Sequence, residues 1–336
     1  MAEIIKTSGR SLYDMVHNLD INGNALKTAE VLQRACPMLQ DAPVVAANNI
    51  LTHKVSIRTS LPKPEVKRLN QGVGGAFGER ENREFGLKIY QSLPWIDKKE
   101  FEFAKHPDDI RQSNMESVIQ GWGQGLEGDF LYDNIAANGA DSINGIATYA
   151  ATIDGKRVIS ALASGDAETD LTSIYFVAWD EAMGAFAIVP QTDTLGVQFE
   201  VLGDEVMQDP ANPAKSLLVE RYKVEASLGF GVKDVRAVAR IANIDLTQIT
   251  DSTKYTNLPK LIMQTLNQFP AYLRSKVVMY MPKEVSLGLQ LAANDKSNAS
   301  FVYGSTELFA DKVPTFNGVP IRESEMISLH ETKVTA

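Results

Sequence analysis

Apolar side chains in residues 10–40 recur at the spacing of a helix. The stripe begins with Leu12 and Met15, is interrupted by the turn sequence DINGN at 20–24, and resumes as far as Pro37. We therefore expect helical structure in this segment. Cys36 lies on its apolar face, which predicts a buried thiol with a structural role rather than a nucleophile.

The pattern changes to alternation in residues 50–105. From Lys54 to Thr59 polar and apolar residues alternate, as in a half-buried strand, and a second extended run covers 85–96. Between the runs lies a glycine-rich segment without the following helix or Gly-Lys-Ser/Thr sequence that phosphate-binding loops require. The pattern predicts a long β-hairpin, and because two strands alone are marginal in water, we expect it to lie on another surface. The glycines expected to make its tip flexible are Gly72, Gly74, Gly75 and Gly78.

A single apolar stripe then predicts a long helix of roughly 25 residues over 107–134, a structural spine. Gly121, Gly125 and Gly128 fall on another face, where we expect close approach of another backbone, because each glycine costs about 1 kcal/mol of helix propensity. The stripe consists of Met115, Val118, Ile119, Trp122, Leu126 and Phe130.

Residues 145–230 are rich in strand patterns, whereas 232–245 return to helical spacing and predict a helix. Strands and helices mix without regular βαβ alternation, so the fold class is α+β. The expected strands are 173–179, 185–190, 197–203, 217–230, 276–281 and three short closing runs after residue 300, and the expected later helices are 258–269 and 283–293.

Composition narrows the function classes. The 336 residues suggest about two domains, and 33 basic against 42 acidic residues give a net charge of −9. No apolar run approaches the ~20 residues of a transmembrane helix, and an acidic chain is a poor candidate for sequence-specific DNA binding. Ten acidic residues and no Lys or Arg lie in 160–210, opposite in charge to a basic cluster in 54–68, so head-to-tail contact between copies is one hypothesis.

The sequence singles out no catalytic, cofactor-binding or metal-ligating residues. The four histidines are scattered, Cys36 is the only cysteine, and no nucleophile elbow or zinc motif occurs. A soluble α+β enzyme whose site is assembled from distant acidic residues stays open as an alternative.

Several stretches together resemble the major capsid protein of short-tailed, double-stranded DNA bacteriophages, which adopts the Johnson-type fold shared by tailed phages and encapsulins. This chain departs from the family pattern at Val66, at Val235 and in the Pro190-Gln191-Thr192 turn. The resembling stretches are YDMVHNLDINGNALKTAEVLQRACPMLQD (13–41), ILTHKVSIRTSLPKPEVKRLNQGV (50–73), WGQGLEGDFLYDN (122–134), LTSIYFVAWD (171–180), LGFGVKDVRAVARIANID (228–245), LPKLIMQTLNQFP (258–270), KVVMYMPKEV (276–285) and FNGVPIRESEMI (316–327).

The resemblance implies a division of the chain into five parts. They are an N-terminal arm (1–45), an extended β-hairpin loop (46–105), a peripheral domain with the spine helix (106–150), mainly axial-domain strands (151–255), and mixed axial and peripheral segments (256–336).

The resemblance also implies a structural, non-enzymatic protein that assembles as hexamers and pentamers into an icosahedral shell around double-stranded DNA. The extended loop would reach over an adjacent subunit, and its glycine-rich tip would let it swing between an immature and an expanded shell. Some relatives form a lysine–asparagine isopeptide bond, for which Lys63 or Lys67 could supply the amine. The candidate contact residues are Lys54, Arg58, Lys63, Lys67 and Arg68.

The partners implied are copies of the same chain, separate scaffolding and portal proteins, a decoration protein in some relatives, and packaged DNA contacted without sequence specificity. No membrane partner is implied. The location implied is the virion, after assembly in the bacterial host cytoplasm. An encapsulin-type nanocompartment with a protein cargo is the alternative within the same fold.

Overall fold

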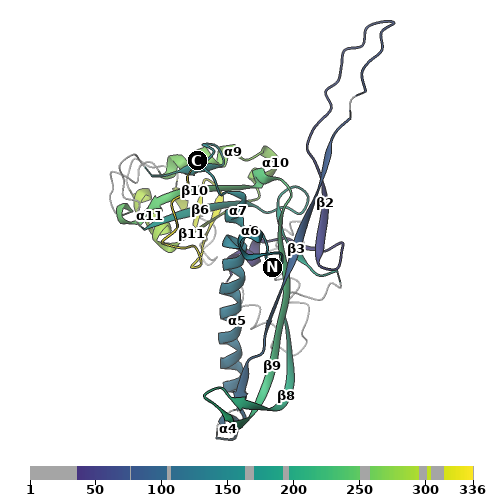
Figure 1. Ribbon diagram of the computed structural model, residues 1–336. Coiled ribbons are helices and arrows are strands. Elements are labelled where there is room, and N and C mark those ends of the chain that lie inside the picture. The colour runs from purple at the N-terminus through teal and green to yellow at the C-terminus, as the bar shows by residue number, and fades with distance from the viewer. Residues whose placement is uncertain are drawn as a thin grey trace, which may run out of the picture.

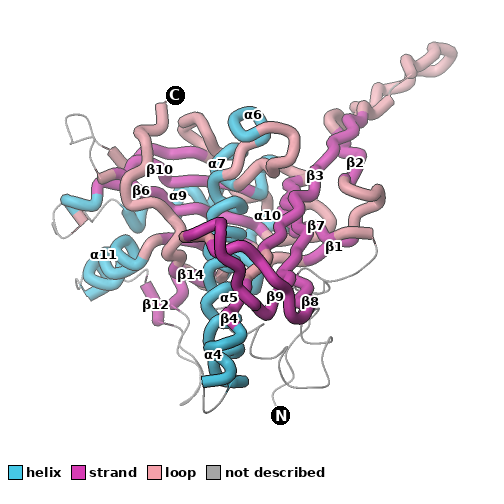
Figure 2. Tube along the Cα trace, turned by 60° about the horizontal axis from the view of Figure 1, so that its bottom comes forward, coloured by secondary structure: helices cyan, strands magenta, loops and turns pink. Residues whose placement is uncertain are grey.

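The computed structural model describes residues 36–75, 77–103, 107–162, 170–191, 197–249, 258–294, 301–303 and 314–335. The long helix α5 (Pro107–Tyr132) organises the molecule, because its C-terminal end enters a globular half while the rest lies beside an elongated sheet (Figure 1). A β-hairpin from that sheet projects beyond the body in both Figure 1 and Figure 2.

The elongated sheet has seven strands among the described residues, in the order β1-β7-β9-β3-β2, and β4 and β8 also pair with β9. The central strand β9 carries four partners, so one strand holds this half together. The strands are β1 (Val44–Ala46), β2 (Thr52–Arg58), β3 (Arg80–Ser92), β4 (Trp95–Asp97), β7 (Ala185–Val189), β8 (Val197–Asp209) and β9 (Asn212–Val232).

The globular half contains the second sheet, in the order β12-β13-β14-β11-β6-β10-β5. Three adjacent inner strands, β11, β6 and β10, are buried along their whole length, as expected of strands covered on both faces. The strands are β5 (Val158–Ser160), β6 (Leu171–Ala178), β10 (Val238–Asp245), β11 (Val277–Met281), β12 (Phe301–Tyr303), β13 (Pro314–Phe316) and β14 (Val319–Glu323).

Shorter helices surround this frame, and no described helix is long and apolar enough to span a bilayer. The helices other than α5 are α3 (Pro37–Asp41), α4 (Lys98–Phe103), α6 (Ile135–Asn138), α7 (Ile146–Tyr149), α9 (Leu258–Gln268), α10 (Ala271–Arg274) and α11 (Lys283–Asn294), with 3-10 turns at Val235–Ala237 and Leu246–Gln248.

The mixed α+β class, the β2–β3 hairpin and the spine helix are confirmed. So are the strands expected over 173–179, 185–190, 197–203, 217–230 and 276–281 and the helices over 258–269 and 283–293. The helical pattern of residues 10–35 and the closing run at 306–309 lie outside the described residues. Cys36 is buried, at the N-cap of α3 rather than inside a helix.

The helix predicted over 232–245 is wrong, because Val238–Asp245 is the strand β10 between β6 and β5. The helical spacing of Val235, Val238 and Ala242 arises because β10 is buried on both faces, so apolar residues need not alternate with polar ones. The polar side chain of Arg240 is accommodated inside by an ion pair with Glu331, whose carboxylate lies 2.8 Å from the guanidinium.

One further expectation needs correction. The hairpin within residues 46–105 does not depend only on another molecule for its partners, because Leu87–Ser92 pair with β9 of their own chain and Trp95–Asp97 do so as well. The loop at 59–79, which joins β2 to β3, lies in the part of the hairpin that projects beyond the body (Figure 1). The division of the chain into five parts stays a prediction; within residues 151–255, β7, β8 and β9 belong to the elongated sheet, whereas β5, β6 and β10 belong to the globular one.

The close backbone approach expected at the α5 glycines is not made within the described part of the chain. A Cβ atom built at Gly121 or Gly125 would meet nothing within 4 Å outside its own helix. At Gly128 it would meet only the Met326 side chain, at 3.5 Å.

The hairpin's outer strand β2 lies at the edge of the sheet, and its edge is partly covered. The Asn48 side-chain amide donates to the Lys54 carbonyl at 2.7 Å, and the Lys54 N–H donates back to Asn48 Oδ1 at 2.8 Å. This one side chain therefore satisfies the backbone groups of Lys54 that a neighbouring strand would otherwise bind.

Candidate assembly surface

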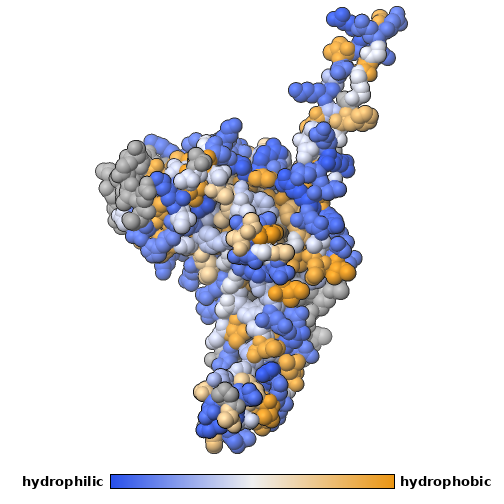
Figure 3. All heavy atoms as spheres, in the orientation of Figure 1, coloured by the Kyte–Doolittle hydropathy of each residue, from blue (hydrophilic) through white to orange (hydrophobic). Residues whose placement is uncertain are grey.

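The projecting loop, residues 59–79, carries apolar side chains that its own chain does not cover. Val66, Leu69 and Phe77 are 94%, 95% and 89% exposed, and Leu61 is 71% exposed. Figure 3 shows apolar and polar residues interspersed along this projection. Exposed apolar side chains on so thin a projection mark a surface for contact with another molecule.

The basic residues expected to make contacts all lie on the hairpin. The Lys54 ammonium is 3.5 Å from the Glu84 carboxylate on the paired strand, and Arg58 is the last residue of β2. Lys63, Lys67 and Arg68 are exposed and make no ion pair within the described part of the chain. Three of the five candidates are therefore grouped on the projecting loop with their charge uncompensated.

The turn of the loop is at Leu69–Asn70, and Asn70 has a φ of +63°. Asparagine tolerates this left-handed backbone better than most residues. Gly72, Gly74, Gly75 and Gly78 lie on the returning chain, just beyond the turn. The Gly74 N–H donates to Glu65 Oε2 across the loop at 3.1 Å, so the two sides of the loop stay together near its end.

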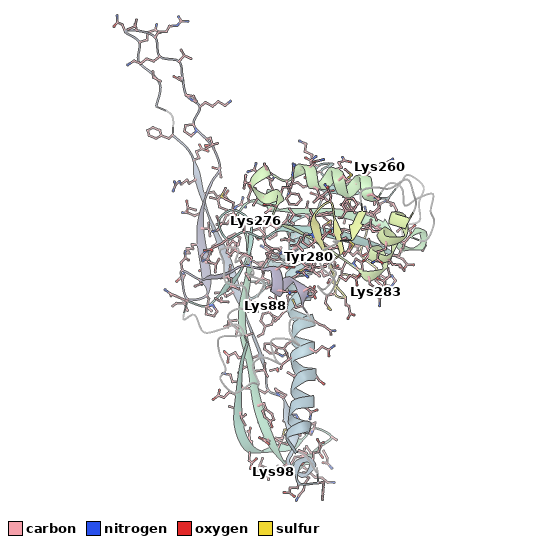
Figure 4. All side chains as sticks on the ribbon, turned by 180° about the vertical axis from the view of Figure 1, so that it is seen from behind. Lys88, Lys98, Lys260, Lys276, Tyr280 and Lys283 are labelled. Carbon is pink, nitrogen blue, oxygen red and sulfur yellow. The ribbon has the colours of Figure 1, made fainter. Side chains whose placement is uncertain are left out.

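The root of the hairpin, by contrast, is fixed to the spine helix. The Lys88 ammonium lies 2.7 Å from Asp129 Oδ2 and 3.0 Å from Asp133 Oδ2 of α5. The Tyr90 hydroxyl donates to the same Asp129 oxygen at 2.7 Å, and Trp122 Nε1 donates to Ser92 Oγ at 3.2 Å. Figure 4 shows Lys88 beside α5, below the globular half, where β3 passes the helix.

At this root, ion pairs and hydrogen bonds outweigh the effect of burial on the charged groups. Burial alone would lower the pKa of Lys88, but its bonds to Asp129 and Asp133 outweigh that cost and raise the pKa. Burial also opposes ionisation of Asp133, yet hydrogen bonds from Asn138 and the Ile143 N–H lower its pKa. Lys88 and Asp133 are therefore both charged at neutral pH, and their ion pair ties β3 to α5.

An aromatic cluster on the other side of the root completes the attachment. Phe186 is fully buried and meets Phe85 edge to face at 5.8 Å between ring centroids, and His53 at 5.6 Å. Burial, with a contribution from the positive charge of Lys233, lowers the pKa of His53. The imidazole is therefore held neutral inside the root.

Three of the seven described acidic residues of 160–210 form ion pairs with a lysine or an arginine of their own chain. Asp180 lies 2.6 Å from Lys276, Glu205 lies 3.1 Å from Arg221, and Asp204 pairs with Lys98. Lys98 marks the end of the elongated sheet away from the globular half (Figure 4). These carboxylates therefore have partners before any neighbour arrives, while Asp166, Glu168 and Asp193 lie outside the described residues.

The spine residues behave as the stripe predicts in the described part of α5. Ile119, Leu126 and Phe130 are buried, and Val118 and Trp122 are half-buried. The Phe130 ring lies 5.6 Å from the Phe230 ring of β9, so the stripe packs on the elongated sheet. Nothing is assigned to the Met115 side chain, which lies outside the described residues.

Sequence reasoning missed the residues that fix the root, namely Lys88, Tyr90, Asp129 and Asp133. One signal was present, since Asp129 and Asp133 are four residues apart and so share a helix face. Among the described residues no three His, Cys, Asp or Glu side chains gather in a metal-binding arrangement. The arrangement as a whole, a fixed root and an uncovered projecting end, is suited to binding another protein surface.

Comparison with known proteins identifies a family. The family model for major capsid protein GP7 matches residues 20–335 of the chain. No curated protein matches it in sequence.

Among solved structures, the chain is similar to the capsid structure of bacteriophage Epsilon15, with a TM-score of 0.66, 22% identity and 100% coverage of both chains. That likeness concerns the fold. The procapsid of bacteriophage JBD30 matches with a TM-score of 0.44 and 12% identity over 90% of this chain and 97% of that one. The SrpI encapsulin of Synechococcus elongatus PCC 7942 matches with 0.42 and 11% over 62% and 86%, and scores this low carry no weight.

Proposed function

The chain belongs to the major capsid protein GP7 family, and from this premise we propose that its projecting loop joins neighbouring subunits of the capsid shell. Its role is structural, as a shell-forming component of a phage virion in which many copies assemble. The observation that carries the proposal is the loop at 59–79, whose apolar side chains are exposed while its root is firmly attached.

Apolar burial supplies most of the binding free energy in this proposal. At about 25 cal/mol per Å², covering on the order of 400 Å² of loop surface contributes roughly 10 kcal/mol before the entropy cost of association. Exposed ion pairs add only about 0–1 kcal/mol each. Lys63, Lys67 and Arg68 therefore select the register and the partner surface more than they add affinity.

Because three of the seven described carboxylates of 160–210 already pair with Lys or Arg, the receiving surface on the neighbour must offer either its remaining acids or an exchange of ion pairs. Exposed pairs exchange at little cost. The contact is heterologous, since the loop of one copy meets a different surface of the next, and such contacts close into rings.

The proposal extends to the form of the shell, its assembly partners and its contact with DNA. The subunits form hexamers and pentamers of an icosahedral shell, which assembles in the host cytoplasm with separate scaffolding and portal proteins. The net charge of −9 suits a container that repels DNA phosphates, so a packaged genome is contacted without sequence specificity. The chain has no catalytic role in this account.

The test is assembly of the full chain with the loop altered. We expect the wild-type protein to form megadalton particles in size-exclusion chromatography and negative-stain microscopy. The triple variant Val66→Ser, Leu69→Ser, Phe77→Ser should stay as small oligomers with an unchanged circular dichroism spectrum, because it loses uncovered apolar surface only. The matched control Met183→Ser, Met263→Ser, Leu287→Ser removes three exposed apolar side chains from the globular half.

Normal shells from the loop variant, or from a chain lacking residues 70–80, would show that the loop is not needed for assembly. An equal loss of particle formation in the control variant would also contradict the proposal, because exposed apolar side chains elsewhere would then matter as much as those of the loop. Particles that carry a protein cargo in place of DNA and a portal would indicate an encapsulin-type container. A chain that remains a small oligomer under every condition would favour the enzyme alternative.

A further inference from the structure

Glu127 is a buried acid in the middle of the molecule with no use in the assembly contact. It lies on α5 with 1% of its surface exposed. Neither carboxylate oxygen has a hydrogen-bond partner of normal geometry among the described residues. Burying an ionised carboxylate without partners is costly, so the site favours the neutral acid.

The groups that face Glu127 do not relieve this cost. Cys36, at the start of α3, presents a buried thiol, and Ser324 and Glu325 follow the end of β14. Burial raises the pKa of Glu127 to about 7, the nearby Ser324 hydroxyl lowers it in part, and the charge of Glu325 raises it further. No cation among the described residues contributes to this site.

Glu127 differs from the two other acidic residues in this part of α5, Asp129 and Asp133. Asp129 and Asp133, two and six residues further on, both form ion pairs with Lys88. Glu127 points to a different side of α5, toward the chain that leaves β14, where a Cβ at the adjacent Gly128 would lie 3.5 Å from Met326. One face of the helix thus binds the elongated sheet through charges, and the other meets the globular half through an unpaired acid.

Glu127 lies where the spine helix α5 meets α3. α3 is attached to the globular sheet, since Asp41 accepts hydrogen bonds from Arg322 at 3.0 Å and from the Tyr280 hydroxyl at 2.9 Å. The other end of α3, at Cys36, lies close enough to Glu127 of the spine helix for the charge of that carboxylate to raise the pKa of the buried thiol, in addition to the larger effect of burial. One continuous core contains residues of α3, α5 and strands of both sheets, and Glu127 is buried where α5 passes through it.

We propose that Glu127 is a proton-dependent latch, which holds α5 against α3 and residues 324–327 when neutral and loosens that junction when ionised. The ionised carboxylate needs water, and water reaches it only if the packed segments separate. A change in the angle between the halves would redirect the loop, and this consequence for the shell rests on the proposed function. The titration of Glu127 does not depend on the proposed function.

The direction of the effect follows from proton linkage. Below pH 4.5 the acid is protonated whether the junction is packed or open, so the latch has no pH dependence there. Between 4.5 and about 7 the open state loses its proton first, so the preference for the packed state declines as the pH rises. Above about 7 the loss is complete, and it amounts to a shift on the order of a hundredfold in the ratio of packed to open states.

The test uses the unassembled full chain and hydrogen exchange of peptides covering 119–131 and 320–331, corrected for the pH dependence of chemical exchange. In the wild type we expect protection to fall by on the order of a hundredfold between pH 4.5 and 8. Glu127→Gln, the neutral isostere, should keep its protection across that range. Glu325→Gln, the matched control, should behave like the wild type with a slightly lower midpoint.

The same pH dependence in the wild type and in Glu127→Gln would overturn the latch. Should Glu127→Gln not fold, Glu127→Met and the protonated-carboxyl stretching band in infrared spectra of the wild type provide the second measurement. Absence of a carboxyl band that titrates near neutral pH would also overturn it. Failure to form particles would bear on the proposed function alone, since this experiment needs no shell.

Discussion

The root and the end of the β2–β3 hairpin belong to one supersecondary element but meet different surroundings. At the root, Phe186 and Phe85 enclose His53, and Lys88 binds two carboxylates of α5. At the end, Val66, Leu69 and Phe77 have almost no contact with their own chain. The difference shows that the root is packed into the subunit while the end is not, which is the basis of the proposal that the end binds a neighbour.

This division has a mechanical consequence. A projection that must bind a neighbour needs a defined direction, which the root provides through charge-assisted hydrogen bonds and edge-to-face aromatic packing. The end needs adaptability, and the glycines beyond the turn are expected to provide it. Substitutions at the two places should therefore affect different measurements.

The largest expected difference comes from the same substitution at the two ends. Phe186→Ala should lower the free energy of unfolding by about 4 kcal/mol, because it opens a cavity in the packed root. Phe77→Ala should change it by less than about 0.5 kcal/mol, because the ring is already exposed. Urea unfolding of the unassembled chain measures both, and comparable losses would contradict the division.

A second comparison uses acids instead of rings. Asp133→Ala should cost about 3 kcal/mol, since it leaves Lys88 short of a partner and the Ile143 N–H without one. Glu65→Ala removes only the exposed bond to Gly74 and should cost about 0.5 kcal/mol or less. Equal urea midpoints for the two variants would show that the Lys88 cluster does not fix the root.

The pH dependence of the root should be opposite in sign to that of Glu127. The pKa of His53 is lowered from its ordinary value of 6.5, so on acidification the unfolded chain gains a proton before the folded one. The stability that wild type has over His53→Gln should therefore shrink as the pH falls below about 6.5. Unfolding midpoints from pH 8 to 5 measure this, and a constant difference would contradict it.

The smallest effect is expected from the basic residues of the loop. Replacing Lys63, Lys67 and Arg68 with glutamine should leave subunit stability unchanged and slow assembly, with a weaker dependence on salt than the wild type has. Light scattering during assembly at several ionic strengths measures this. An unchanged salt dependence would indicate that these charges meet no counter-charge on the neighbour.

Local periodicity was sufficient to predict most strands and helices, because α5 has one buried face and β2 alternates. It failed at Val238–Asp245, where burial on both faces removes the alternation that separates a strand from a helix. Whether Val238–Asp245 can be a fully buried strand depends on the ion pair of Arg240 with Glu331, which is 91 residues away in the chain. No local window contains that information.

The site was predictable only in part, for the same reason. The hairpin and its basic residues were visible in the sequence, whereas the attachment of its root needed Lys88 and α5 to meet across about forty residues. The acidic run was read as free for a neighbour, yet Asp204 pairs with Lys98 and Asp180 with Lys276. The sequence does not reveal that Glu127 is buried without a cation or a good hydrogen-bond partner, because this depends on which residues of three separate segments surround it.

The amide of Asn48 gives the outer strand of the hairpin a built-in guard. By occupying both backbone groups of Lys54, it interrupts the row of donors and acceptors on which a stray extended peptide would grow. Addition of a second extended chain along β2 is therefore disfavoured at Lys54, which lowers the tendency of free subunits to stick together through this edge. In the proposed function, recognition of a neighbour is left to the side chains of the projecting loop.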